Sequence, residues 1–288
     1  MPFDHAFLTS YNFEPTRHAY TERDVILYAL GLGLGARPTD PTHLQFTYEK
    51  GLKVLPTMAV VLAHPGRWTD NPDLGIDSVR MLHGEQGLTL HRPVPVKGEV
   101  LGISRIREVI DRGPEKGAVL YYEREIIDAA DNRPIATVRQ TLVCRGNSGC
   151  GGPESRMAPP HAMPGRTADI VFEVATLPQM ALIYRLSGDM NPLHVDPDFA
   201  AKAGFARPIL HGLATYGLGG RAVIETVCDG DPSRLRSFDV RFTAPALPGD
   251  TIRVQLWVDG GTVSVRAVAV ERDIVVMDNG RAEITTGV

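Results

Sequence analysis

The fold depends on the stretch LHGLATYGLGGRAVIETV at residues 210–227 and on the strands that follow it. Its pattern predicts a helix, which Asp229 and Gly230 end. Four glycines lie inside it, and each costs about 1 kcal/mol relative to alanine in a helix interior. Packing against the rest of the protein must therefore stabilise this helix. Its glycines indicate close approach to a sheet or to a ligand.

A series of antiparallel strands follows the helix. Alternating apolar and polar residues predict strands at 238–242, 251–258, 262–271 and 281–286. Turn residues separate these strands at 248–250, 259–261 and 278–280. The second half of the chain is therefore expected to fold as a helix followed by an antiparallel meander.

The first half of the chain repeats this order. It predicts a second meander, with strands at 86–90, 98–107, 118–128 and 135–144 and turns at 112–113 and 131–132. A helix wrapped by a curved antiparallel sheet is the hot-dog architecture. The chain therefore predicts an α+β double hot dog whose two sheets merge into one. We expect an N-terminal unit at 1–144, a Gly- and Pro-rich linker at 145–169 and a C-terminal unit at 170–288.

The composition limits the classes of function. Hydrophobic residues make up 43% of the chain and charged residues 22%, as in a globular protein. The formal charge of -4, without a run of Lys or Arg, argues against nucleic acid as a partner. No signal peptide and no membrane span are expected. Three cysteines without C-x-x-C spacing predict no disulfide framework and a reducing, cytoplasmic location.

The stretch YRLSGDMNPLHVDP at residues 184–197 is the most informative about function. Its last two residues, Asp196 and Pro197, predict the start of a short helix over 197–203, because an N-cap carboxylate precedes a residue with fixed φ. The polar residues before that helix lie in an irregular segment, which Pro192 makes rigid. A rigid loop of this kind can aim side chains at a substrate.

Asp189, His194 and Gly212 make a candidate acid/base site. A carboxylate and an imidazole at one water's distance can transfer protons in both directions, as the addition of water to a conjugated alkene requires. The negative charge that then develops on a thioester oxygen needs a hydrogen-bond donor. The N–H of Gly212, near a helix start and without a Cβ to block approach, can supply one.

Several other readings of these residues are weaker. An isolated Asp/His pair is more often a turn residue and a loop histidine, but the complete motif favours function. A metal site of Asp189, His194 and Asp196 lacks a further ligand at a supporting spacing, so no metal is expected. The glycines at 31, 33 and 35 follow a helical pattern rather than a strand, so no dinucleotide or other cofactor is expected.

The motif at 184–197, with PILHGL at 208–213, resembles the MaoC-like, (R)-specific enoyl-CoA hydratases. LHGEQ at 82–86 and FDVRF at 238–242 resemble the two-hot-dog type found in peroxisomal multifunctional enzymes. The resemblance implies a hydro-lyase of fatty acid β-oxidation that hydrates trans-2-enoyl-CoA to (3R)-3-hydroxyacyl-CoA. In it Asp189 and His194 would activate one water, Asn191 would orient the pair, and the Gly212 N–H would bind the thioester oxygen.

The same resemblance implies contacts with the acyl-CoA substrate. Arg112 stands where the family tends to have Lys, and either cation can meet a CoA phosphate. Met190 stands where Trp is common. For His211 a structural role and a role in the site remain equally open. The residues expected to line the substrate site are His83, Gly84, Arg112, Met190, Pro192, Leu193, His211 and Phe242.

The first half is expected to lack catalytic side chains. When Tyr28 is aligned with Tyr184, Gly33 and Gly35 stand opposite Asp189 and Asn191. Glycines at these places leave room instead of charge, so the first half is predicted to hold the acyl chain. A homodimer resembles the habit of the family, although a monomer is feasible. Two alternatives stay open: an acyl-CoA thioesterase and a non-catalytic acyl-CoA-binding subunit.

Overall fold

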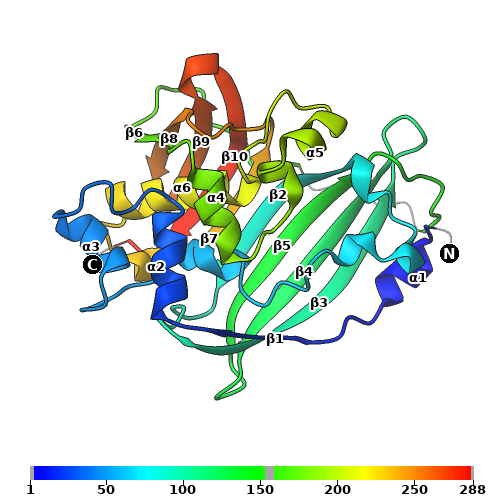
Figure 1. The fold of residues 1–288 in the computed structure, drawn as a ribbon, viewed down its shortest axis with the longest axis horizontal. Helices are drawn as coiled ribbons and strands as arrows, with labels where there is room; N and C mark the ends of the chain where they lie inside the picture. Colours follow the sequence, from blue (N-terminus) through cyan, green and yellow to red (C-terminus); the bar gives the residue numbers. More distant parts are fainter. Residues whose placement is uncertain (1–2, 153–158, 287–288) are drawn as a thin grey trace.

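The computed structural model describes residues 3–152 and 159–286. Within these residues ten strands form one antiparallel sheet in the order β1-β3-β4-β5-β2-β7-β10-β9-β8-β6 (Figure 1). The strands are β1 (Thr16–Tyr20), β2 (Met81–Leu90), β3 (Gly98–Asp111), β4 (Ala118–Asp128), β5 (Pro134–Cys144), β6 (Ile170–Ala175), β7 (Leu235–Phe242), β8 (Thr251–Asp259), β9 (Thr262–Ala269) and β10 (Ile274–Ile284).

The sheet has two halves that mirror each other. The order β1-β3-β4-β5-β2 in the first half corresponds to β6-β8-β9-β10-β7 in the second. The central strands β2 and β7 pair antiparallel, from Glu85 opposite Arg241 to Thr89 opposite Ser237, so the two halves share one continuous sheet. This arrangement confirms the predicted α+β double hot dog.

Apart from α1, which precedes β1, and η8, which lies between β9 and β10, the helices follow the first strand of each half. In the second half they precede β7, and in the first half they precede β2. The α-helices are α1 (His5–Ser10), α2 (Glu22–Leu30), α3 (Pro41–Thr47), α4 (Met180–Tyr184), α5 (Pro197–Lys202) and α6 (Gly212–Thr226). The 3-10 helices are η1 (Pro56–Val60), η2 (Trp68–Asp70), η3 (Pro72–Leu74), η4 (Ser78–Arg80), η5 (Arg185–Ser187), η6 (Pro192–His194), η7 (Pro232–Arg234) and η8 (Val270–Arg272).

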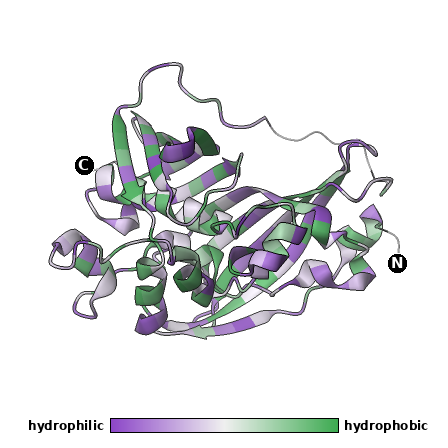
Figure 2. Cartoon of the chain, turned by 45° about the horizontal axis from the view of Figure 1, so that its top comes forward, coloured by the Kyte–Doolittle hydropathy of each residue, from purple (hydrophilic) through white to green (hydrophobic). Residues whose placement is uncertain are grey.

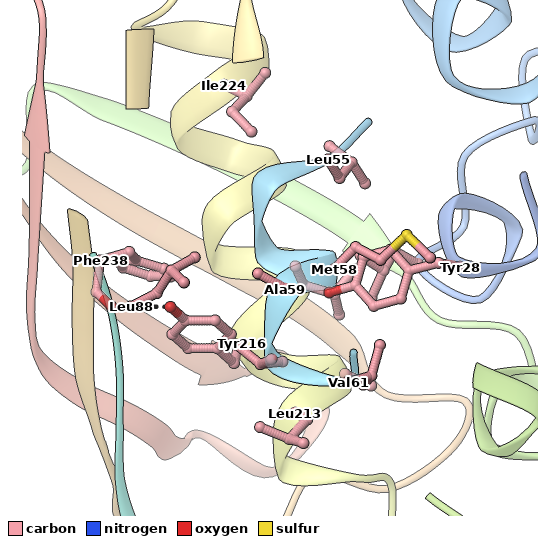
Figure 3. Close-up of a cluster of buried hydrophobic side chains, with 14 of the residues drawn as sticks. Tyr28, Leu55, Met58, Ala59, Val61, Leu88, Leu213, Tyr216, Ile224 and Phe238 are labelled. Carbon is pink, nitrogen blue, oxygen red and sulfur yellow. Dashed lines mark hydrogen bonds between the residues drawn. The ribbon is translucent and has the colours of Figure 1, made fainter. Parts of the chain in front are cut away.

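Helix α6 is the central helix of the second half, as its sequence predicts. All its residues from Leu213 to Ile224 are buried, so no face of that stretch meets water. A Cβ at Gly219 would lie 2.6 Å from Met277, and one at Gly220 would lie 2.5 Å from Thr57. These two glycines let the helix approach the sheet on one side and η1 on the other (Figure 3). Close packing offsets their low helix propensity.

The first half has a much shorter central helix. The segment that corresponds to α6 is η1, which contains five residues and lies against α6 in the main hydrophobic core (Figure 3). A second hydrophobic cluster lies under α1 at the far end of the sheet, where Trp68 stacks on Tyr122 at 5.1 Å between ring centroids. Along the strands hydrophobic and hydrophilic residues alternate, as one buried face requires (Figure 2).

The prediction of two simple meanders is wrong for one strand in each half. Strands β3, β4 and β5 are consecutive neighbours, as are β8, β9 and β10. However, β2 pairs with β5 and β7 pairs with β10, so the first strand of each series crosses to the last. Spacing along the chain cannot reveal such a crossover, because the pairing is decided by which edge of each meander remains free.

The predicted turn at 278–280 is also wrong, because β10 runs through it. The register of β10 against β7 shifts between Asp278 and Arg281, and Asn279 has φ +53°. The residues that predict a turn form a β-bulge instead. Arg266 binds the Asp278 carboxylate at 2.9 Å, which ties the bulge to β9. The actual turn before β10 is η8, followed by Asp273 at φ +49°.

The predicted linker is only partly described, since its residues 153–158 lie outside the described residues. His161 lies on the second half of the sheet, with Nε2 2.8 Å from the Ser264 hydroxyl. None of the helices in the described ranges is long and apolar enough to cross a membrane.

Candidate active site

The loop between η5 and α5 has the rigid form that its sequence predicts. The Asp189 carboxylate accepts a hydrogen bond from the Asn191 N–H at 3.3 Å. The Asn191 side-chain oxygen accepts one from the Leu193 N–H at 3.1 Å and caps η6. The Asp196 carboxylate caps α5 by accepting from the Phe199 N–H at 3.1 Å. Side chains that accept backbone N–H groups therefore fix this loop from end to end.

His194 is buried in a fixed orientation. Its Nδ1 lies 2.9 Å from the Ile209 carbonyl oxygen, and a carbonyl can only accept, so Nδ1 carries the hydrogen. The Nε2 atom then presents its lone pair. Burial lowers the pKa of His194, and the Asp189 carboxylate acts in the opposite direction. The imidazole is therefore neutral at neutral pH and can accept a proton at Nε2.

His211 lies directly against His194. The two rings stack at 3.7 Å between centroids, and His211 Nε2 donates to the Asp189 backbone carbonyl at 3.1 Å. Burial lowers the pKa of His211 to about 4, with His194 as a further cause. Its Nδ1 is buried and has no hydrogen-bond partner among the described residues. His211 thus holds the Asp189 backbone and also lies within the candidate site, so both a structural role and a role in the site are compatible with its position.

Asp189, His194 and His211 converge. One oxygen or nitrogen atom of each lies within 4.8 Å of those of the other two. In the described ranges this is the one group of His, Cys, Asp or Glu with a spacing that a metal ion could also use. Asp196, which the sequence offers as a metal ligand, is instead the exposed N-cap of α5. The same distances suit a single water between a carboxylate and an imidazole.

Gly212 begins α6 directly after His211. Its N–H belongs to the first turn of the helix, which has no intrahelical acceptor, and no other described residue accepts from it. A Cβ here would meet the Phe242 ring at 3.5 Å, an ordinary contact. Packing therefore does not require glycine at this position, although the positive end of the α6 dipole lies there.

His83 and Phe242 join this end of α6 from the two central strands. Their rings lie 5.1 Å apart, and His83 Nε2 donates to the Glu85 carbonyl at 3.0 Å. Burial lowers the pKa of His83 to about 4, against the opposing charge of Asp189. Gly84 lies in a bulge of β2, where a Cβ would meet Val143 at 3.1 Å. Gly84 therefore has a packing reason of its own.

Arg112 is not brought to the acid/base pair. It is exposed in the turn between β3 and β4, and its charge acts on Tyr121. Tyr121 pairs with Thr141, whereas His83 pairs with Leu142, so Tyr121 and His83 point to opposite faces of the sheet.

The remaining predicted contacts lie in the motif loop. Met190 is 53% exposed, while Pro192 and Leu193 are half-buried beside His194. The exposed Met190 gives the loop next to Asp189 an apolar surface in contact with water.

Sequence reasoning missed His64. It lies in the first half, yet the charge of Asp189 acts on it, and burial lowers its pKa to about 3. No spacing in the sequence relates it to the motif, because only the tertiary fold brings the two halves together.

Two family descriptions match the chain. Residues 160–279 match the family described as MaoC like domain, and residues 18–146 match the one described as MFE-2 hydratase 2 N-terminal domain.

Individual relatives are similar over most of the chain. An enoyl-CoA hydratase of Mycobacterium tuberculosis is 35% identical over 284 residues, which cover 97% of this chain and 98% of that protein. The peroxisomal multifunctional enzyme type 2 of Mus musculus is 35% identical over 274 residues, which cover 92% of this chain but 36% of the longer mouse protein. The crystal structure of a MaoC-like dehydratase from Phytophthora capsici superposes with a TM-score of 0.86 at 32% identity, covering 98% and 99% of the two chains.

Proposed function

Because the chain belongs to the MaoC-like dehydratase family and is a hydro-lyase, we propose that it hydrates trans-2-enoyl-CoA to (3R)-3-hydroxyacyl-CoA. The observation that carries this proposal is the convergence of Asp189, His194 and His211 within 4.8 Å at the start of α6. The pair that accepts and returns the proton is Asp189 and His194.

One water supplies both the hydroxyl group and the new hydrogen of the product. Asp189 and neutral His194 both present lone pairs, so they hold the two hydrogens of the water and leave its oxygen free to attack C3. One of them takes a proton as the C3–O bond forms, and the electron pair of the double bond moves towards the thioester oxygen. The same proton then passes to C2. Hydroxyl and hydrogen reach one face of the alkene, which gives syn addition.

Gly212 and Asn191 support this step. The free N–H of Gly212 is available to the thioester oxygen as its charge grows, where the α6 dipole adds to the stabilisation. Asn191 fixes the carboxylate through its backbone N–H and fixes η6 through its side chain, so it acts by holding the loop.

The substrate is proposed to lie between the two halves. His83, Phe242 and the motif residues Met190, Pro192 and Leu193 surround the pair, and we assign them to the enoyl thioester. The acyl chain extends towards the first half, whose Val61 carbonyl lies next to Gly188. Arg112 is assigned to a CoA phosphate outside the site, as a surface cation.

The proposed reaction needs no metal and no cofactor, because one water and two side chains supply every proton. We also propose that the protein is a homodimer, which analytical ultracentrifugation tests, and that it acts in the cytoplasm, which localisation of a tagged chain tests.

Asp189→Asn and His194→Gln test the proposed function. Each should lower kcat for crotonyl-CoA hydration by at least about 100-fold, since each removes one of the two proton acceptors. Asp196→Asn in the same loop is the matched control and should change the rate by less than about 2-fold, because Asn is an equally good N-cap. Chiral analysis should find only the (3R) product. Full activity of both site variants, or release of free CoA thiol, would contradict the proposal.

A further inference from the structure

A segment of the first half, Val61 to His64, begins beside the motif loop, where the Val61 carbonyl lies near Gly188. Gly188 precedes Asp189, and a Cβ built on it would have the Val61 carbonyl oxygen as its near neighbour, at 3.8 Å. Ala63, two residues further on, is buried and has φ +48°. This left-handed conformation is strained for alanine, so the fold must hold it in place.

Three contacts hold the strained turn. The Ala63 N–H donates to His18 Nδ1 at 2.9 Å. Gly102 faces the turn, where a Cβ would lie 2.5 Å from the Ala63 carbonyl oxygen. Just upstream, the Val60 carbonyl accepts from the buried Arg124 guanidinium at 2.7 Å. These contacts fix the backbone at the residue before His64, which sets the direction of its side chain.

His64 is enclosed but not fully covered. Part of its side chain is accessible, and neither ring nitrogen bonds to another of the described residues. Burial lowers its pKa to about 3, Arg124 acts in the same direction, and Asp189 opposes them. The ring is therefore neutral, so one nitrogen carries a hydrogen and is free to donate it.

The other three histidines near Asp189 cannot do this. His194, His211 and His83 each spend their N–H on a backbone carbonyl, those of Ile209, Asp189 and Glu85. They present only lone pairs to the site, and the Asp189 carboxylate also only accepts. Of the four histidines near Asp189, His64 is thus the one whose N–H is not bonded to another described residue, and the Gly212 N–H is a second such donor.

Only one oxygen in the proposed reaction needs such a donor. The attacking water must keep its lone pair for C3 and gives its hydrogens to Asp189 and His194. The thioester oxygen, by contrast, gains negative charge as hydroxide adds. We therefore propose that His64 donates its N–H to the thioester oxygen of the bound enoyl-CoA, beside the Gly212 N–H.

The inference rests on the proposed hydratase function and adds a residue of the first half to the oxyanion site. The buried charge of Arg124, which has no carboxylate partner among the described residues, strengthens His64 as a donor. The first half then contributes to the chemistry as well as to the acyl pocket.

His64→Leu and His64→Gln test the inference on crotonyl-CoA. Leucine removes the donor and should lower kcat by about 100-fold with little change in KM, since losing one oxyanion donor has an effect of this order. Glutamine keeps an N–H and should recover most of kcat. His91→Leu, at an exposed histidine, is the matched control and should behave as the wild type.

A vibrational measurement separates a direct contact from a structural role. In the Asp189→Asn background, which binds without turnover, the thioester C=O stretch of bound enoyl-CoA should shift to lower frequency. His64→Leu should reduce that shift. Wild-type kcat in His64→Leu, an unchanged C=O shift, or a glutamine variant as slow as the leucine variant would overturn the inference. An inactive wild type would instead overturn the proposed function itself.

Discussion

The polar side chains around Asp189 in the second half and those around Gly33 in the first half differ in how they are paired. In the second half, Asp189, His194 and His211 converge within 4.8 Å, and the buried Nδ1 of His211 has no hydrogen-bond partner among the described residues. In the first half, Gly33 stands opposite Asp189 when the sequences of the two halves are aligned, and a Cβ on Gly33 would lie 3.3 Å from the Arg221 guanidinium. Arg221 comes from α6 of the second half and crosses to fill this place.

The polar side chains of Arg221 and His43, which lie beside Gly33 and Gly35, have hydrogen-bond partners. Arg221 donates to Glu225 at 2.5 Å and to the Leu32 carbonyl at 2.8 Å. His43 accepts from the Gly35 N–H at 3.0 Å. The expectation that glycines leave room at this place is therefore wrong, because a long side chain of α6 occupies it. A proposed acyl pocket must lie elsewhere in the first half, and the segment before His64 is where the halves meet at Asp189.

The difference shows what an active site in this fold requires. Paired charges stabilise the region of Gly33, whereas the region of Asp189 keeps a buried acceptor, His211 Nδ1, without a partner among the described residues. An unpaired buried acceptor costs stability and suits proton transfer. Changes at each place should thus affect different measured quantities.

Glu225→Ala should remove the ion pair between Arg221 and Glu225 beside Gly33, with the largest effect on stability. It leaves the buried Arg221 charge without its carboxylate, so the free energy of unfolding should fall by about 3 kcal/mol, while kcat of the folded protein stays unchanged. Urea denaturation and hydratase assays measure the two. Asp229→Asn, at the exposed pair with Arg234, is the control and should cost less than about 0.5 kcal/mol. Equal losses in both variants would refute the contrast.

Acid should destabilise the protein through the buried histidines near Asp189. The unfolded chain binds a proton at each histidine near pH 6.5, whereas burial lowers the pKa of His83 and His211 to about 4 in the fold. The unfolded state therefore binds more protons between these values, and stability falls as the pH drops from about 6.5 towards 4. Each histidine should account for about 2 kcal/mol between pH 7 and 5.

Urea denaturation at both pH values tests this acid sensitivity. His83→Gln should lose less stability on acidification than the wild type, because it removes one of the buried histidines whose pKa the fold lowers. An identical pH dependence in the variant would show that His83 is not the cause.

The start and the middle of α6 should respond differently to an added methyl group. Gly220→Ala places a Cβ 2.5 Å from Thr57 and should cost about 1–2 kcal/mol of stability, since overpacking outweighs the gain in helix propensity. Gly212→Ala meets Phe242 at an ordinary 3.5 Å and should leave stability unchanged, yet lower kcat/KM by up to about 100-fold by crowding the oxyanion donor. Thermal unfolding and initial rates check both. A destabilised Gly212→Ala protein with unchanged kcat/KM would reverse this assignment.

Much of the fold could be predicted because it depends on local patterns. The motif loop, the start of α5 at Asp196 and the span of β4 follow from caps, turn residues and alternation within a few positions. The bulge at 278–280 could not be predicted, because Asp-Asn-Gly suits a turn and a bulge equally, and only pairing with β7 and β9 decides between them.

The sequence by itself determined the double hot dog and the helix that begins near Gly212, and it led to the proposal of Asp189 and His194 as the acid/base pair. Each depends on residues that are neighbours in the chain and on local backbone preferences. Only the tertiary structure decided that Arg221 lies against Gly33, that His211 holds the Asp189 backbone and that the charge of Asp189 acts on His64. These contacts join residues that are not neighbours in the chain, and the contact between Arg221 and Leu32 also joins the two halves that β2 and β7 merge into one sheet.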